Sequence, residues 1–342
     1  MTTKEQMEHT LDETVPAKEQ LDKIYTLAKR VLDIAPWEFM GEPHVLAIQH
    51  AIDDTSFLIV TGELGTYFSV QIYSSLHDLD AMLRQGEENR QDLVDRMFEL
   101  PQLKLVFSTK AELLPGDREK IKASGITFKN GKNPSLQSMM PGYDLSGVGG
   151  REIERLTVCV EQLLFMLEGC HTIPAISSPL DPICTLVFKE GCWEQEMKKH
   201  SLFKKSVFSV SQELLDQVMN LPKQNMSMAC GCFVIPTHFR EKGSRPVMPR
   251  AFMLMDVESE FILKMDLLTP EQGKLWNITV ALNVLLQQFI KLGARPSLLK
   301  INGLLLQKVG KQFCTLIDVA YDDRRFKPML QALQDITSRF GG

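Results

Sequence analysis

The sequence predicts an α/β protein, closer to the α+β type, with two mixed-sheet domains whose hairpins are backed by helices. The chain of 342 residues is longer than one ordinary domain and long enough for two cores. Alternating strand patterns and amphipathic helical patterns occur in both halves. The order hairpin, helix, strand, helix also recurs, although no residue-level repeat accompanies it.

The first half begins with a helix that leads into strands. Residues 17–34 place apolar side chains at helical intervals, and Ala35 ends this helix because it precedes a proline. Residues 44–75 alternate as three short strands, with turns at 53–54 and 62–65. We therefore expect an antiparallel sheet to start directly after the first helix.

The remainder of the first half predicts helices around a loop. The expected elements are a helix over 77–99 that weakens near Gly86, a strand over 103–109, a short helix leading to another strand, and an amphipathic helix over 150–168. Pro-Gly-Tyr and Gly-Gly sequences mark 132–150 as a long exposed loop. The first domain is placed at 17–170, after a polar tail over 1–16 that we expect to be disordered.

The second domain is placed at 171–342. Its expected elements are a hairpin over 182–199, a helix capped by Ser211, a strand over 226–238, a hairpin over 250–268, a helix from Thr269 and Pro270 to Gly293, a strand over 297–301, a helix over 303–311, a strand over 314–319 and a helix over 326–339. This order predicts a sheet whose later strands are separated by helices.

Composition and charge limit the class of function. The apolar share of 44% and the charged share of 24% are those of a globular protein, and no run approaches the length of a membrane span. A net charge of −5 argues against a nucleic-acid partner. The N-terminus lacks an apolar secretion signal, so we expect a cytoplasmic protein. No motif for a nucleotide or another cofactor occurs, and none is expected.

The seven cysteines are odd in number and lie in apolar segments. Cys230 and Cys232 point to one face of a predicted strand, with His238 nearby. A structural zinc site, however, usually has a second ligand pair at recognisable spacing, and none is present. We interpret the cysteines as reduced, buried side chains and predict no metal site.

Four segments carry a family resemblance. They are "LAKRVLDIAPWEFM" and "PSLQSMMPGYDLSGVGGREIERLTVCVEQLL" in the first half, and "SRPVMPRAFMLMDVESEFIL" and "KLGARPSLLKING" in the second. Together they resemble a family of bacterial proteins of unknown function that pairs two such domains. The resemblance covers roughly 20–340 and is weakest over 171–225. It implies a cytosolic two-domain α/β protein and attaches no activity.

Asp256 raises the alternative of a metal-dependent nuclease. It lies on an apolar strand of a hairpin, and Asn302 follows a later strand, an order typical of ribonuclease-H-like integrases. Two-metal catalysis needs several carboxylates, but Asn302 is neutral and no acid occurs over 303–313. The second domain is thus predicted to have a degenerate ribonuclease-H-like topology at most. Asp256 with Ser259 equally fits an ordinary hairpin turn.

Five further residues are candidates for binding. Trp37 is either a partner anchor or a plug for its own core, and Tyr143 lies on the predicted loop. Arg245 and Arg250, in a basic stretch with His238, Arg240 and Lys242, suit a phosphate or carboxylate, and Arg295 occupies the Gly-x-Arg-Pro turn. With Asp256 and Asn302 they complete the predicted binding set.

The leading hypothesis is a non-catalytic binding protein whose partner is another protein or a second copy of itself. The alternative is a divergent ribonuclease-H-like nuclease or nucleic-acid-associated protein that uses Asp256. No residue is assigned a catalytic role. We expect the two halves to pack through helices, with the largest pocket between them near the loop 238–250.

Overall fold

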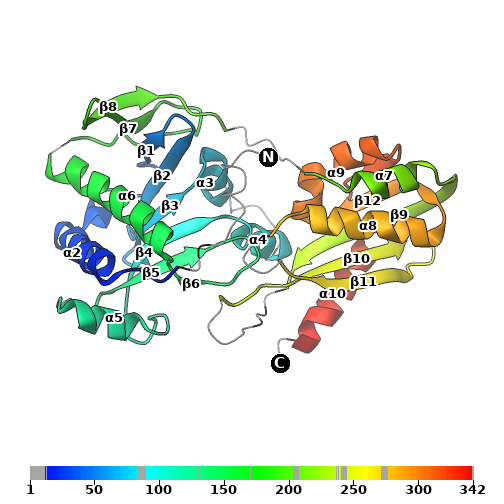
Figure 1. The fold of residues 1–342 in the computed structure, drawn as a ribbon, viewed down its shortest axis with the longest axis horizontal. Coiled ribbons are helices and arrows are strands. Elements are labelled where there is room, and N and C mark those ends of the chain that lie inside the picture. Colours follow the sequence, from blue (N-terminus) through cyan, green and yellow to red (C-terminus); the bar gives the residue numbers. More distant parts are fainter. Residues whose placement is uncertain are drawn as a thin grey trace.

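In the computed structural model the chain forms two sheets, each covered by helices, in two lobes that Figure 1 shows side by side. The structure describes residues 12, 14–83, 90–128, 131–169, 171–202, 208–235, 237, 239, 245–270 and 276–340. These two sheets confirm the predicted α/β class and the two-domain arrangement.

The first sheet is built mainly from neighbouring strands in an antiparallel run. Its strands are β1 (Leu46–Ala51), β2 (Asp54–Thr61), β3 (Phe68–Tyr73), β4 (Gln102–Ser108), β5 (Asn133–Met139), β6 (Ser146–Gly147), β7 (Ile183–Lys189) and β8 (Cys192–Lys198). They lie in the order β6-β5-β4-β3-β2-β1-β7-β8. The three strands expected over 44–75 are β1, β2 and β3, so that prediction is confirmed.

Helices cover both faces of the first sheet. Helices α2 (Lys18–Ile34) and α6 (Gly150–Glu168) bury their apolar stripes on one face, as their periodicity predicts. Helix α3 (Leu76–Leu83) lies on the opposite face with a smaller apolar cluster. The short helices η1 (Pro36–Glu38), α4 (Arg90–Met97) and α5 (Asp117–Ser124) complete the lobe.

The domain boundary predicted at residue 170 is wrong, because β7 and β8 belong to the first sheet. β7 pairs parallel with β1, with Leu46 opposite Cys184, and β8 pairs antiparallel with β7. A parallel pair requires a long crossover, and α6 supplies it from β6 to the far side of β1. The hairpin over 182–199 was predicted correctly, but its own residues do not reveal which sheet it joins.

The predicted disordered tail is also corrected in part. Residues 1–11 and 13 lie outside the described residues. Asp12 is only 6% exposed, and its carboxylate binds the start of α6. The tail therefore contributes a defined contact at this point.

The second sheet consists of β9 (Lys223–Val234), β10 (Arg250–Asp256), β11 (Ile262–Leu268), β12 (Arg295–Asn302) and β13 (Ala320–Asp322), in the order β11-β10-β9-β12-β13. The β9–β10 and β10–β11 pairs are antiparallel, whereas the β9–β12 and β12–β13 pairs are parallel. This mixed sheet, with a hairpin at one side and parallel strands at the other, agrees with the mixed-sheet second domain that the sequence predicts.

The helices of the second lobe separate its parallel strands and cover both faces. They are α7 (Gln212–Met219), α8 (Thr279–Leu292), α9 (Leu304–Leu316) and α10 (Lys327–Phe340). The first three pack on one face and α10 packs on the other. Ser211 caps α7 as predicted, and Gly293 ends α8 in the left-handed conformation.

Three predicted element boundaries are wrong. The segment 132–150 is not one exposed loop, since β5 is buried along its whole length. The strand expected over 314–319 begins within the last turn of α9, which ends at Leu316 and buries Cys314 in the core. The strand itself follows as β13. Helix α8 begins at Thr279 rather than after Thr269, and residues 271–275 lie outside the described residues. Among the described helices, none combines the length and apolar character required to cross a membrane.

Candidate functional site

Residues 141–144 and 245–249, parts of the predicted Pro-Gly-Tyr loop and of the basic loop, bind each other across the domain junction. Tyr143 and Val247 form an antiparallel bridge. The amide of Asp144 donates to the carbonyl of Pro246 at 2.9 Å. The amide of Met248 donates to the carbonyl of Gly142, also at 2.9 Å. Tyr143 itself is 4% exposed. The loop that the sequence presents as open to a partner is thus used inside the molecule.

Gly142 explains why this loop contains Pro-Gly-Tyr. Its φ of +92° lies in the left-handed region, and a side chain there would meet Trp276 at 2.9 Å. The backbone amide of Trp276 donates to the carbonyl of Pro141 at 3.0 Å. The glycine therefore lets the first domain approach the second closely.

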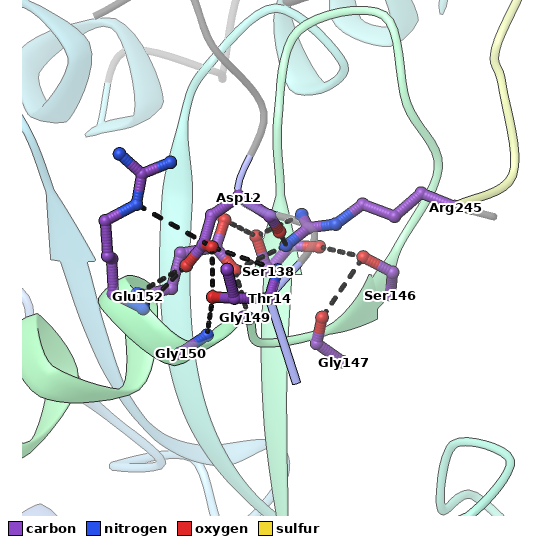
Figure 2. Close-up of polar contacts among 10 residues, drawn as sticks. Asp12, Thr14, Ser138, Ser146, Gly147, Gly149, Gly150, Glu152 and Arg245 are labelled. Atoms are coloured by element: carbon purple, nitrogen blue, oxygen red, sulfur yellow. Dashed lines mark hydrogen bonds and ion pairs between the residues drawn. The ribbon is translucent and has the colours of Figure 1, made fainter. Parts of the chain in front are cut away.

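Arg245 reaches from the second domain into a polar cluster of the first, as Figure 2 shows. Its guanidinium lies 2.5 Å from a Glu152 carboxylate oxygen and donates to Ser138 Oγ at 2.9 Å. It also donates to the backbone carbonyl of Asp12 at 2.9 Å. The side chains of Arg245 and Glu152 are each only 8% exposed. Charge-assisted bonds of this kind fix one orientation of the two domains.

Asp12 caps the N-terminus of α6 beside this ion pair (Figure 2). Its carboxylate accepts from the amides of Arg151 at 2.7 Å and Glu152 at 3.1 Å. Burial acts to raise the pKa of Asp12, but the hydrogen bonds from Thr14 and from these amides outweigh burial and lower it. The carboxylate therefore stays ionised where the helix dipole favours a negative charge.

A cavity of about 440 Å³ lies next to the cluster. Its lining combines Asp12, Ser146 and Lys120 of the first lobe with Arg245 and Pro246 of the second. Its position near Arg245 agrees with the pocket expected at the loop 238–250, although 238 and 240–244 lie outside the described residues.

Arg250 forms the second ionic contact of the junction. Its side chain is 0% exposed and pairs with Glu99 of the first domain. The guanidinium also lies 4.3 Å from the centre of the Trp276 ring and donates to the carbonyl of Met248. Burial lowers the pKa of Arg250, and the Asp95 carboxylate opposes that effect. An arginine remains protonated under these conditions, so this is a buried ion pair.

Helix α4 connects the lobes next to Arg250. Figure 1 shows it between them, and it contacts both α9 and β9. Asp95 accepts from the backbone amide of Val234 at 2.8 Å. A cavity of about 350 Å³ lies between α4 and the first turns of α9, lined in part by His77, Glu99 and Gln307. The halves thus pack through helices, as expected, and also through the two loops.

Trp37 is a core residue rather than an exposed anchor. It is 4% exposed and packs against Phe68 and Phe107, with ring centres at 5.0 and 5.5 Å. The ammonium of Lys132 lies 5.0 Å from the Trp37 ring centre and 3.6 Å from that of Phe68. The Trp37 segment therefore closes one end of the first core.

Several apolar side chains near Trp37 in the chain or in the β2–β3 turn are exposed. Phe39 is 57% exposed, Leu64 is 91% exposed and Tyr67 is 52% exposed. The β2–β3 turn that carries Leu64 packs on η1, because Gly62 lies within van der Waals reach of Trp37. We call Phe39, Leu64 and Tyr67 the apolar tip.

Asp256 and Asn302 are not brought together. Asp256 pairs with Met228 on β9, whereas Asn302 pairs with Gly231, and their strands flank β9 on opposite sides. Three residues along β9 and two strand spacings across separate them by ~10 Å in each direction. Asp256 instead accepts from the amide and hydroxyl of Ser259 at 2.8 and 2.7 Å, so it holds the β10–β11 turn.

Arg295 and Asn302 act within the second core. Arg295 donates to the carbonyls of Leu221 and Ile317, at 3.2 and 2.8 Å. Asn302 is 1% exposed and accepts from the amide of Phe326 at 2.8 Å. Both side chains satisfy backbone groups at the ends of elements.

Cys230 and Cys232 also belong to the second core. Both are 0% exposed, and burial raises the pKa of each thiol well above its ordinary value. Within the described residues, no group of three or more His, Cys, Asp or Glu side chains is placed to hold a metal ion.

One polar feature escaped the sequence analysis. Lys104 on β4 is 8% exposed and lies in register between Gln71 on β3 and Gln137 on β5. Burial lowers the pKa of Lys104 to about 8. Alternation of polar and apolar residues in these strands predicts a solvent-facing row, and only its burial reveals an unusual environment.

Comparison with protein families assigns the two lobes. Residues 22–186 match the family model described as Domain of unknown function (DUF7309), and residues 214–337 match Domain of unknown function (DUF6930). The chain thus pairs two domains of unknown function, which is consistent with the two-domain family of unknown function that the motifs resemble. The DUF7309 match ends inside β7, so it also extends beyond residue 170. Neither a curated protein nor a solved structure matches the chain.

The junction lies between these two domains. Arg245 and Arg250 belong to the DUF6930 domain, whereas Glu99, Tyr143 and Glu152 belong to the DUF7309 domain. Three residues of the predicted binding set, Tyr143, Arg245 and Arg250, thus meet where the domains join. Trp37, Asp256, Arg295 and Asn302 lie elsewhere.

Proposed function

We propose that this protein is a non-catalytic binding protein and that the apolar tip is its contact with a protein partner. The observation that carries the proposal is the exposure of Phe39, Leu64 and Tyr67 over one buried aromatic cluster. Single exposed apolar residues are ordinary, but several of them on two segments that pack together, η1 and the end of β2, favour an interaction site. Aromatic side chains on a rigid support are also frequent in the centres of interfaces.

The charges around the apolar tip favour a basic partner. Glu38, Glu42 and Glu63 are exposed beside it, and the Glu63 carboxylate lies against Gly41. We therefore infer a partner segment with an apolar anchor flanked by lysine or arginine. Binding through such a rim weakens as salt increases.

The same proposal includes the compartment and the origin. The six described cysteines are unpaired thiols, which is typical of a reducing cytoplasm. Bacterial origin rests on the resemblance of the motifs alone. Catalysis through Asp256 is not proposed, since its carboxylate holds a turn far from Asn302.

The test compares two equally exposed apolar residues at opposite ends of the first sheet. Leu64 lies in the β2–β3 turn, and Ile52, 89% exposed, lies in the β1–β2 turn. Leu64→Glu is expected to abolish capture of a partner from native lysate, whereas Ile52→Glu is expected to preserve it. With the purified partner, calorimetry should give a Kd at least about tenfold weaker for Leu64→Glu, which corresponds to ~1.4 kcal/mol.

Melting temperatures serve as the control for folding, because both side chains are exposed and neither variant should be destabilised. A partner that binds the Leu64→Glu variant as tightly as the wild type would contradict the assignment of the site. Failure of the wild type to retain any protein would contradict the proposed function itself.

A further inference from the structure

Strand β11 forms the outer edge of the second sheet, and no strand of the described chain pairs with its outer side. Several of its apolar side chains remain at the surface. Ile262 is 36% exposed, Met265 is 38% exposed and Leu267 is 44% exposed, and Phe261 just before the strand is 68% exposed. An open edge that carries apolar side chains is a template for another strand.

The side chains of β11 divide between its two faces. Met265 and Leu267 pair with Met253 and Ala251, which belong to the cluster under α10. Lys264 and Asp266 face the opposite side and form an ion pair of 2.8 Å. Their side chains are 29% and 37% exposed, so both charges are accessible from the edge.

The pattern of β11 is complementary to itself when the strand is reversed. A two-fold axis between identical antiparallel strands must pass through a pair of equivalent residues, because residues directly opposite each other point to the same face of the sheet. An axis at Lys264 places two lysines opposite each other, and an axis at Asp266 places two aspartates opposite each other. An axis at Met265 places each Lys264 opposite Asp266 of the second copy.

We propose that two copies of this chain associate through β11, antiparallel about an axis at Met265. The two five-stranded sheets then continue as one sheet across the molecule. Two Lys–Asp pairs lie on one face, and Met265 meets its equivalent on the other beside Leu267. The β-bulge between Leu254 and Met255 in the pairing with β10 displaces Leu263 and limits the regular contact on one side.

This association is independent of the apolar tip, which lies on the other domain. Because Lys264 and Asp266 form the proposed pairs, charge complementarity is the decisive test. Lys264→Asp makes the strand acidic, and Asp266→Lys makes it basic, so each variant alone should repel its own copy. A mixture of the two variants restores opposite charges in every pair.

The experiment is sedimentation of the full chain at concentrations up to about 100 µM. The wild type is expected to sediment as a dimer of the 38.8 kDa chain. Each single variant should dissociate, with a Kd roughly tenfold weaker or more, and an equimolar mixture should recover the dimer. Lys311→Asp, an exposed change on α9, is the matched control and should remain dimeric.

Three results would overturn the proposal. A wild type that stays monomeric would mean that Lys264 and Asp266 protect the edge or that a different protein covers it. A dimer unaffected by either charge change would place the contact elsewhere. A mixture that fails to reassociate, while both variants retain the wild-type melting temperature, would exclude the pairing at Met265.

Discussion

Arg250→Ala is expected to destabilise the protein by about 3–5 kcal/mol, because it leaves the Glu99 carboxylate buried without its cation. The same substitution removes the contact with the Trp276 ring. Chemical denaturation followed by tryptophan fluorescence measures the loss, and limited proteolysis should show earlier cleavage at the domain junction. A cost below about 1 kcal/mol would contradict the ion pair as an important contact.

Two variants separate the ion pair from a general effect of losing arginine. Arg324→Ala removes a guanidinium that is 80% exposed in its pair with Asp322, and it should leave the denaturant midpoint close to that of the wild type. The double variant Arg250→Met with Glu99→Met removes both buried charges. It should regain most of the stability lost in Arg250→Ala, because two buried apolar side chains take the place of a buried carboxylate that has no cation.

Lys104→Met is expected to have the opposite effect and stabilise the protein at pH 7 by up to about 3 kcal/mol. The ammonium of Lys104 is buried, and no carboxylate in the described part of the chain pairs with it. At pH 7 both the folded and the unfolded chain carry the proton, so the folded chain bears the cost of the buried charge. The lowering of the Lys104 pKa from 10.5 to about 8 sets the size of the expected gain in stability.

The gain from Lys104→Met should disappear as the pH rises. Between about 8 and 10.5 the folded chain releases the Lys104 proton while the unfolded chain retains it, so the wild type gains stability over that range. Denaturant midpoints of both proteins at pH 7, 9 and above 10 measure the difference. Lys110→Met, an exposed change in the loop after β4, should show none. A constant difference at every pH would indicate packing rather than charge.

Local sequence patterns predict most of the secondary structure. The helical spacing over 17–34 and 150–168 predicts α2 and α6, and the apolar pattern over 250–268 predicts the β10–β11 hairpin. Each of these inferences depends on neighbours within a few residues.

The junction could not be predicted because its partners lie far apart in the sequence. Arg245 meets Glu152 across 93 positions, and Arg250 meets Glu99 across a longer interval. A cluster of arginines on a loop has the same pattern whether it binds an external anion or a carboxylate of its own chain. The buried position of Lys104 was hidden for a related reason, since alternation in β3 and β4 is typical of a sheet with one face in water.

The parallel pairing of β1 with β7 has a consequence for how the protein is made. Leu46 of β1 lies opposite Cys184 of β7, which is 138 positions later in the chain. The edge of β1 that faces β7 therefore stays uncovered until β7 has been synthesised. During synthesis the nascent first domain therefore exposes an apolar strand until the following hairpin has left the ribosome. Such a long-range contact also slows folding. An expression fragment that stops near residue 170 would keep that edge open permanently and would be prone to aggregate, whereas one that extends past Lys198 contains every strand of the first sheet.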